Sequence, residues 1–502
     1  MKQEREKIPW HPRREPRIPG PLTPEAIRQV FDGCVDFEER EVLLGGDTAK
    51  KTTLFTIGGM VRNERLNDYV LRPVAVSEEI RDATLDEAFS RMLAGAVYNR
   101  SAQVRKTVDE VVFDLINGSA IFAFPDRAEM LSFSVATEEK RSVSEPENEP
   151  ALKSARDSFV ESVRTNTSLV RRRLRAPELR IHEEIVGRQT LTPVDILFID
   201  GLTNPELVQE TIGRIQTMDI DALLSTGNLE EYIVDETDTP FPLLAYTERP
   251  DRFCTGLAAG RVGIIIDGIP LGYLLPGTVG QFFRAGEDRS RNWIAASCIT
   301  VLRYVCMLAS LFLPSVYVAA VNFHPEMIPV RLAQSIAMAK VDVPFSTVFE
   351  VLILLLAFEI VQEAGLRLPS SIGQTVSILG GLVVGTAAVE AKIVSPAVLI
   401  VVAVAGIAGY TMPSQEFSAA LRIWRFGLVI AASLAGLAGV ILAAAALVHH
   451  LAALESFGVP YLTPFADGLD VQRKGNGMIR WPLPWVKFRE RGLKTLNRRK
   501  QK

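Results

Sequence analysis

Cysteine and histidine are scarce in this chain, and neither is arranged for chemistry. The four cysteines (Cys34, Cys254, Cys298 and Cys306) show no paired spacing, so a disulfide framework is not expected. The five histidines are scattered, without the spacing of metal ligands. The sequence offers no Ser/His/Asp, Cys/His or paired-carboxylate arrangement with useful spacing. It therefore predicts a protein that is not an enzyme and that has neither a metal site nor a cofactor.

The N-terminus lacks an apolar segment, so no cleaved signal peptide is expected and the N-terminal half is predicted to stay in the cytosol. Residues 1–24 are instead rich in Lys, Arg and Pro, which is typical of a loosely attached arm. At the other end, residues 473–502 contain eleven Lys or Arg and a single acid, Glu490. Such a basic tail is expected on the cytoplasmic side, either bound to anionic lipid or simply solvated there.

Long apolar runs are confined to residues 294–453, where five blocks follow about 290 residues of charged sequence. Runs such as Val351–Leu356 and Val398–Ala405 are too apolar to stay in water, so this region is predicted to lie in a bilayer. A few ionisable residues lie inside the blocks. Charges retained within lipid are costly, which makes them candidates for function.

An internal repeat organises the N-terminal half. Two pairs of glycines, Gly59 with Gly201 and Gly118 with Gly260, are each separated by 142 positions, and the short apolar runs beside them match. In both copies a β-branched run turns at glycine into an amphipathic helix, and a second run follows a further helix. We therefore predict two related α/β subdomains, each a small sheet with helices packed against it. The helices expected before the second run are Thr107–Ile116 and Asp251–Ala259.

Three motifs in this half have structural interpretations. Arg171–Arg175 follows a helical stretch and is interpreted as a solvated helix end or a contact between protomers rather than a phosphate or nucleic-acid site. Asp251 is expected to be the N-cap of the helix that starts there. Gly45–Thr52 lacks the second glycine of a phosphate loop, so phosphate binding is not expected. No nucleic-acid partner is predicted.

Ionisable side chains in the apolar blocks are the candidates for intramembrane charge. Arg303 lies about ten residues into the first block, where it either faces a partner helix or water, or stays near the headgroups because the span begins later. Glu359, Glu363 and Arg367 lie at i, i+4 and i+8, so they form a ladder on one helix face or neutralise a helix end. Glu350 is half a turn away from Glu359 and cannot serve the same surface.

The segment 372–389 is short for a membrane span and rich in glycine. At helical spacing, one of its faces is small and mildly polar around a single branched apolar residue. This face suits a water-filled pore with a hydrophobic constriction, but it also suits tight helix packing, which the residues alone favour. The face consists of Gln374, Ser377, Gly381, Val384 and Ala388.

The basic flanks limit the number of crossings. Arg284, Arg289 and Arg291 place the start of the first membrane helix in the cytoplasm, as the tail does for the C-terminus. Five full crossings would separate the two ends, so we predict four, the last of them at Phe426–Leu447, with 372–389 re-entrant. The fold class is an α/β cytoplasmic half of two related subdomains followed by an α-helical polytopic membrane domain. The predicted divisions are 1–24 (arm), 25–140 and 153–291 (subdomains), 141–152 (linker), 292–455 (transmembrane domain) and 456–502 (tail).

Ten short motifs resemble the signature of the A-subunit proteins of the GerA spore germination family, and they cover roughly residues 150–466. The motifs are Asn166–Arg173, Thr247–Arg252, Gly260–Val262, Asp267–Gly268, Arg367–Pro369, Ile372–Thr375, Gly380–Gly385, Ala388–Ala391, Ile393–Pro396 and Ser456–Tyr461. The first repeat copy is more divergent.

The resemblance implies the A component of a germinant receptor in the spore inner membrane. Such proteins work with a transporter-like B subunit that binds the nutrient and with a lipoprotein C subunit. They are thought to form a ring, expected to be a pentamer, that acts as a nutrient-gated ion channel. The resemblance therefore favours the pore for 372–389, with Val384 as the constriction and Glu390 near a mouth. Lys392 beside Glu390 leaves ion selectivity open.

Three alternatives to a channel-forming receptor component stay open. A SpoVAF-type paralogue shares the motifs and assists later release of ions or dipicolinate. A secondary transporter would need inverted repeats and more spans than this sequence offers. A membrane scaffold for a cytoplasmic sensor would use the same apolar blocks without conducting.

Overall fold

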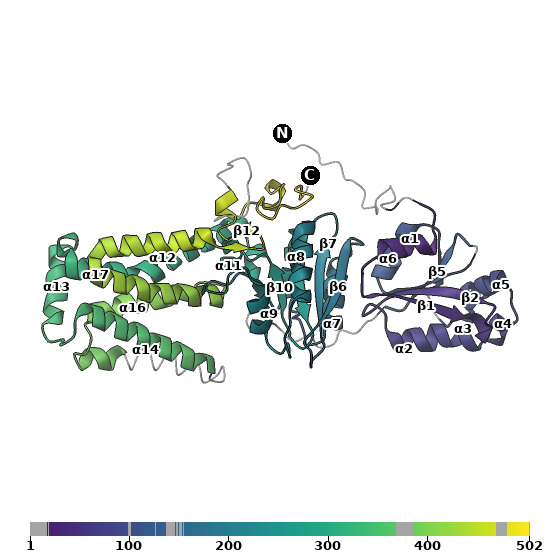
Figure 1. Cartoon of the computed structure of the whole chain (residues 1–502), viewed down its shortest axis with the longest axis horizontal. Helices are drawn as coiled ribbons and strands as arrows, with labels where there is room; N and C mark the ends of the chain where they lie inside the picture. The colour runs from purple at the N-terminus through teal and green to yellow at the C-terminus, as the bar shows by residue number, and fades with distance from the viewer. Residues whose placement is uncertain are drawn as a thin grey trace. The chain divides into compact units, whose positions relative to one another are not determined.

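The computed structural model describes residues 20–98, 102–125, 127–136, 155–367, 385–467 and 479–500, together with positions 18, 146, 149 and 153. The chain divides into two compact units (Figure 1). Unit 1 holds the described residues up to 149, then 155–233 and 246–274. Unit 2 holds residue 153, 234–245 and the described residues from 275 onward.

Unit 1 contains two five-stranded sheets with the same strand order. The first is β1-β2-β4-β5-β3 and the second is β6-β7-β9-β10-β8, so each strand has its counterpart five strands later. Neighbours in the first sheet are antiparallel, as are β6–β7 and β7–β9. The shared order confirms the two related α/β subdomains. The strands are β1 (Phe37–Leu43), β2 (Lys51–Ile57), β3 (Ala102–Arg105), β4 (Ser119–Ala123), β5 (Met130–Ser134), β6 (Leu179–Val186), β7 (Thr192–Ile199), β8 (Ala245–Thr247), β9 (Val262–Ile266) and β10 (Gly272–Leu275).

The two glycine pairs that mark the repeat adopt matching backbone conformations. Gly59 and Gly201 have φ angles of 75° and 70°, and Gly118 and Gly260 have φ angles of 84° and 99°. Residues with a Cβ are strained at such left-handed values. At Gly118 an added Cβ would also lie 2.5 Å from the carbonyl oxygen of Met60. The constant offset therefore reflects two tight turns that both copies need.

Capping side chains start several helices of unit 1. α6 matches the predicted helix after Thr107, whose hydroxyl and backbone N–H form a reciprocal capping box with Glu110. α10 matches the second predicted helix, but the N-cap assignment was wrong: Arg249 is the N-cap, and the carboxylate of Asp251 pairs with its guanidinium. The helices are α1 (Pro24–Val30), α2 (Asn63–Leu66), α3 (Arg72–Val76), α4 (Glu78–Arg81), α5 (Leu85–Arg91), α6 (Val108–Ile116), α7 (Val163–Arg173), α8 (Pro205–Gln216), α9 (Thr226–Ile233) and α10 (Pro250–Ala258), with short segments η1 (Leu44–Gly46), η2 (Asn67–Leu71) and η3 (Met92–Ala96).

The central strands β4 and β5 of the first sheet are buried on both faces. In β4, Ala120 and Phe122 join a core with residues of α3 and α5, whereas Ile121 and Ala123 join a second core with residues of α1 and α6. Successive side chains of a strand point to opposite faces. A central strand covered by helices on both sides is therefore a continuous apolar run, which is why the repeat was visible in the sequence.

Unit 2 is mainly helical. α12 and α17 are long and apolar enough to cross a membrane, and α16 is a shorter apolar helix. The elements are α11 (Val279–Phe282), η4 (Gly286–Arg289), α12 (Trp293–Phe323), η5 (Pro325–Met327), α13 (Val330–Lys340), α14 (Thr347–Arg367), a helical segment at 385–390, α16 (Pro396–Gly409), α17 (Gln415–Ala453), β11 (Glu455–Ser456), β12 (Val459–Pro460), η6 (Phe465–Asp467) and η7 (Leu483–Trp485).

The helix α17 is a hairpin of two arms rather than a straight rod (Figure 1). Its backbone leaves the helical conformation at Ala435 and Gly436. The ring of Phe241 lies 5.7 Å from that of Phe417 and 6.0 Å from that of His450. A straight helix would separate these two residues by about 50 Å. The prediction of a single crossing at Phe426–Leu447 was therefore wrong, because the chain reverses within it.

The predicted basic tail begins as a folded part of unit 2. Ser456 accepts a hydrogen bond from the backbone N–H of Gly277 and donates one to the carbonyl oxygen of Leu243. Tyr461 is fully buried, and burial raises the pKa of its phenol well above the usual value. Farther along, the guanidinium of Arg480 donates to backbone carbonyl oxygens of η4 and the residues that lead into α12. The tail therefore anchors the start of the helical bundle.

Candidate functional site

Most of the predicted pore face lies outside the described residues. Gln374, Ser377, Gly381 and Val384 fall in this group, so their pore-lining role stays a prediction. Ala388 is half-buried and Glu390 is exposed, both in the helical segment 385–390. Just after it, Lys392 Nζ lies 2.6 Å from Asp342 Oδ2, so the cation beside Glu390 has its own acidic partner.

Arg303 is neutralised from outside the membrane helices. Its guanidinium forms a two-pronged ion pair with Asp288 in η4, with N–O distances of 2.5 and 3.1 Å, and also donates to the carbonyl oxygen of Phe283. Both partners precede α12 in the chain. The guanidinium of Arg303 therefore reaches back to the segment that precedes α12.

Glu350 stabilises the start of another helix. Its side chain is fully buried in α14, and Oε2 accepts a 2.7 Å hydrogen bond from the backbone N–H of Ser395, the N-cap of α16. A carboxylate at this position complements the positive end of the helix dipole. Lys340 Nζ lies 3.8 Å from the other oxygen and contributes further charge balance.

Glu359 faces a different neighbour, as its half-turn offset from Glu350 predicts. Its Oε2 lies 3.4 Å from Nη1 of Arg422 in the first arm of α17. Glu363, one turn on, is exposed, and Arg367 ends α14 with a side chain outside the described part. The positive charge beside Glu359 thus comes from another helix, α17. The sequence did not identify this residue, Arg422, as a candidate.

Polar side chains join α12, α14 and α17, and Arg425 is the most deeply buried charged residue among them. It is 2% exposed, and Nη2 donates to Ser310 Oγ of α12 at 2.5 Å. Its Nε and Nη1 are buried without a hydrogen-bond partner among the described residues, and so is Oε1 of Glu359. We call Ser310, Glu359, Arg422 and Arg425 the polar cluster. It joins α12, α14 and α17.

The position of Arg425 makes its burial costly. It lies near the middle of the arm 415–434, about 15 Å from either end. An arm of this length matches the hydrocarbon core of a bilayer. Arg422 and Arg425 are three residues apart and share a helix face, which is the sequence signal that could have identified them. The sequence analysis did not include these two arginines, because its last apolar block begins at Phe426.

Arg171 in unit 1 is not solvated. It is fully buried, with Nε 2.6 Å from Asp36 Oδ2 and Nη2 2.8 Å from Oδ1. Asp36 belongs to the first repeat copy and Arg171 to α7 of the second. The interpretation of Arg171–Arg175 as a solvated helix end was therefore wrong for its first residue. This pair ties the two subdomains together.

A second carboxyl group of unit 1, that of Asp195, has a raised pKa. Asp195 lies directly opposite Glu183 in the β6–β7 register, and one guanidinium, that of Arg164, contacts both. Burial raises the pKa of Asp195 to about 7, against the opposing effect of Arg164. Unit 1 thus contains a carboxyl group that titrates near neutral pH.

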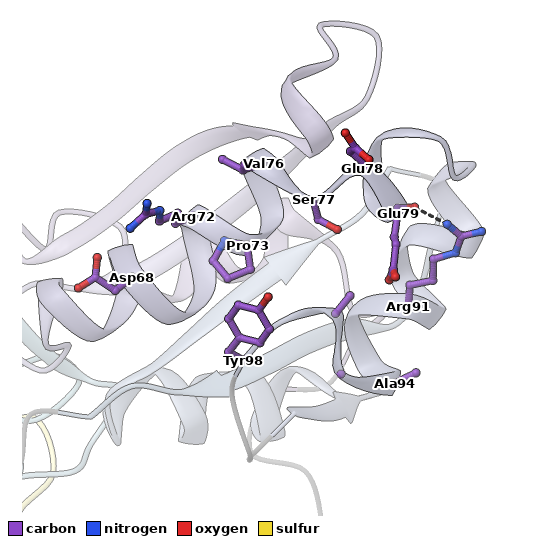
Figure 2. A pocket seen from close by; sticks show the side chains of 12 residues that line it. Asp68, Arg72, Pro73, Val76, Ser77, Glu78, Glu79, Arg91, Ala94 and Tyr98 are labelled. Carbon is purple, nitrogen blue, oxygen red and sulfur yellow. Dashed lines mark hydrogen bonds between the residues drawn. The ribbon is translucent and has the colours of Figure 1, made fainter.

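A surface hollow of about 860 Å³ lies in the first subdomain (Figure 2). Acidic and basic side chains alternate around it, and the guanidinium of Arg91 donates to the carbonyl oxygen of Glu79. Exposed Val76 and Tyr98 form part of its wall. The hollow is open and its charges are mixed, whereas the polar cluster holds a buried guanidinium with unused donors. The polar cluster is therefore the stronger candidate site.

Apolar helices of membrane-spanning length that enclose buried charges are features of an integral membrane protein. The chain matches the family described as Bacillus/Clostridium GerA spore germination protein over residues 25–492, and it belongs to that family. This confirms the resemblance seen in the motifs.

Individual relatives match most of the chain. The chain is 36% identical to the uncharacterized membrane protein YfkQ of Bacillus subtilis (strain 168), over 88% of this chain and 84% of that protein. It is 35% identical to spore germination protein B1 of the same organism, over 88% of this chain and 91% of that protein. One solved structure, the N-terminal domain of the A subunit of the Bacillus megaterium spore germinant receptor GerK3, is 26% identical, with a TM-score of 0.39, over 50% of this chain and 92% of that chain.

Proposed function

We propose that this chain is the A subunit of a spore germinant receptor in the spore inner membrane, and that copies of it form a ring that conducts ions when nutrient binds. The observation that carries the proposal is the family match over residues 25–492, which spans both units. Relatives at 32–36% identity that carry the name spore germination protein support the same role.

In this proposal the short segment 372–389 faces the ring axis, with Val384 as its constriction. Glu390 lies at a mouth of the pore. The ion pair between Lys392 and Asp342 supports this placement, because Lys392 then does not neutralise the carboxylate of Glu390. A carboxylate ring of this kind favours cations.

The remaining parts serve assembly and coupling. A transporter-like B subunit supplies the nutrient site, and a lipoprotein C subunit completes the receptor. Unit 1 and both termini lie on the spore core side, where the repeated subdomains pack between neighbouring copies of the chain and transmit gating. The basic residues of the tail contact anionic lipid.

Replacing Val384 with Ala tests the constriction. The change removes about two methyl groups of apolar surface per protomer, worth roughly 1.5 kcal/mol. A leak on the order of tenfold above wild type follows from such a change in barrier. Spores carrying Val384→Ala should therefore germinate without nutrient, scored by loss of heat resistance, whereas Val383→Ala, which turns away from the predicted face, should stay dormant. Normal dormancy at normal protein level would count against the assignment.

A further inference from the structure

The polar cluster has more positive than negative charge. Glu359 and Arg422 are the charged side chains that interact electrostatically with Arg425, and they form an ion pair with each other. The charge of Arg425 is therefore uncompensated among the described residues. A buried, unpaired charge is strongly destabilising in an apolar environment. The arrangement therefore calls for a further negative charge.

The donors of Arg425 are also only partly used. Nη2 bonds Ser310, while Nε and Nη1 are buried and lack a partner within the described ranges. A guanidinium carries five N–H donors in a planar fork, so several remain to be satisfied. Buried donors of this kind are almost always paired with protein groups, water or an ion.

A small cavity of about 10 Å³ lies beside this guanidinium, so it holds a single small particle. Glycine keeps it open: a Cβ at Gly409 would lie 3.1 Å from Ser310 Oγ and 3.4 Å from Arg425 Nη2. The lining offers donors from two arginines, an amide and the Tyr410 hydroxyl, whereas the Ser418 hydroxyl donates to the carbonyl oxygen of Gly409. The lining residues are Phe358, Gln362, Gly406, Gly409, Tyr410, Ser418, Arg422 and Arg425.

We propose that this cavity binds one small monovalent anion, of the size of chloride, held by Arg425 with help from Arg422. The cavity is too small for phosphate or for an organic carboxylate. A water molecule could satisfy the free donors, but only an anion also removes the surplus charge. The bound ion joins α14, α16 and α17 into one packed group. This inference rests on the polar cluster and does not depend on ion conduction by the chain.

Anion binding is tested on the purified full-length protein in detergent at fixed ionic strength. Chloride replaces gluconate stepwise while thermal unfolding is followed, and equilibrium dialysis with radioactive chloride measures the number of ions bound. We expect a saturable rise in Tm and one ion per chain. The Arg425→Gln variant should lose binding by about tenfold or more. The control Arg331→Gln, at an exposed site on α13, should behave as wild type.

Bromide should compete with chloride in the dialysis, and gluconate should not. Because the wild-type stoichiometry needs no variant, it decides the matter even where Arg425→Gln folds poorly. No bound chloride and no anion-specific change in Tm would assign the cavity to water and overturn the proposal. Unchanged binding in a folded Arg425→Gln protein would overturn it as well.

Discussion

Replacing Arg171 with Met is expected to destabilise unit 1 by about 3–5 kcal/mol, the usual cost of leaving one partner of a buried ion pair uncompensated. The guanidinium is fully buried against Asp36 and also donates to the carbonyl oxygen of Leu179 at 3.4 Å. Its removal leaves the carboxylate of Asp36 in the core without a counter-ion. Because the two residues belong to different repeat copies, the subdomains should also separate more readily.

Hydrogen exchange of the full-length protein measures this effect. Amides in β1, β2 and β6 should exchange at least roughly a hundredfold faster in Arg171→Met, since each 1.4 kcal/mol corresponds to a factor of ten. Arg188→Met is the matched control, because its pair with Asp219 has a 2.6 Å N–O distance but exposed side chains. An exposed pair contributes about 0–1 kcal/mol. Equal exchange in the two variants would show that the buried pair does not hold unit 1 together. Adding Asp36→Leu to Arg171→Met should restore part of the stability.

Replacing Gly436 with Ala should disrupt the hairpin of α17, at a cost of about 3 kcal/mol or more from backbone strain and overpacking combined. Gly436 has φ 58° and ψ −140°, a conformation that essentially only glycine adopts. An added Cβ would also lie 2.9 Å from Cγ of Phe323. The two arms could then no longer turn back on each other while keeping their contacts with α12.

Gly427 is the matched control for this substitution. It lies in the same element, in regular helix, and nothing lies within 4 Å of the position of an added Cβ. Gly427→Ala should therefore be neutral or stabilise by about 0.5–1 kcal/mol, because alanine is the better helix former. Helical circular dichroism during heating, with gel filtration of the detergent-solubilised proteins, compares the two. A Gly436→Ala protein as stable and monodisperse as Gly427→Ala would contradict the hairpin.

The α/β half was predictable from the sequence because its signals are local and repeated. Tight turns at Gly59 and Gly118 require glycine, and the same requirement recurs at Gly201 and Gly260, so the duplication is visible without a structure. The buried strands are continuous apolar runs because both of their faces are buried. Strand order, which depends on long-range pairing, was not predicted beyond the statement that each copy forms a small sheet.

The charges were harder to place, because a single sequence does not show which partner a charge will meet. Arg171 lies in a basic run that looks solvated, yet its partner Asp36 lies 135 positions earlier. Arg425 was missed because the apolar block was interpreted as one helix from Phe426. Gly436 lies inside that block and is the point at which the helix reverses. These three cases have the same physical origin, since tertiary contacts decided the outcome.

Ion flux into liposomes that contain only this chain tests the central claim most directly. Purified wild-type protein and the Val384→Ala variant are reconstituted at equal density, and cation uptake is followed with a fluorescent indicator. Conduction by this chain predicts flux through the Val384→Ala vesicles well above that of protein-free vesicles, with the wild type lower because its constriction stays closed. Flux equal to that of empty vesicles for both proteins, with insertion and ring assembly verified, would contradict the channel and leave a non-conducting membrane scaffold.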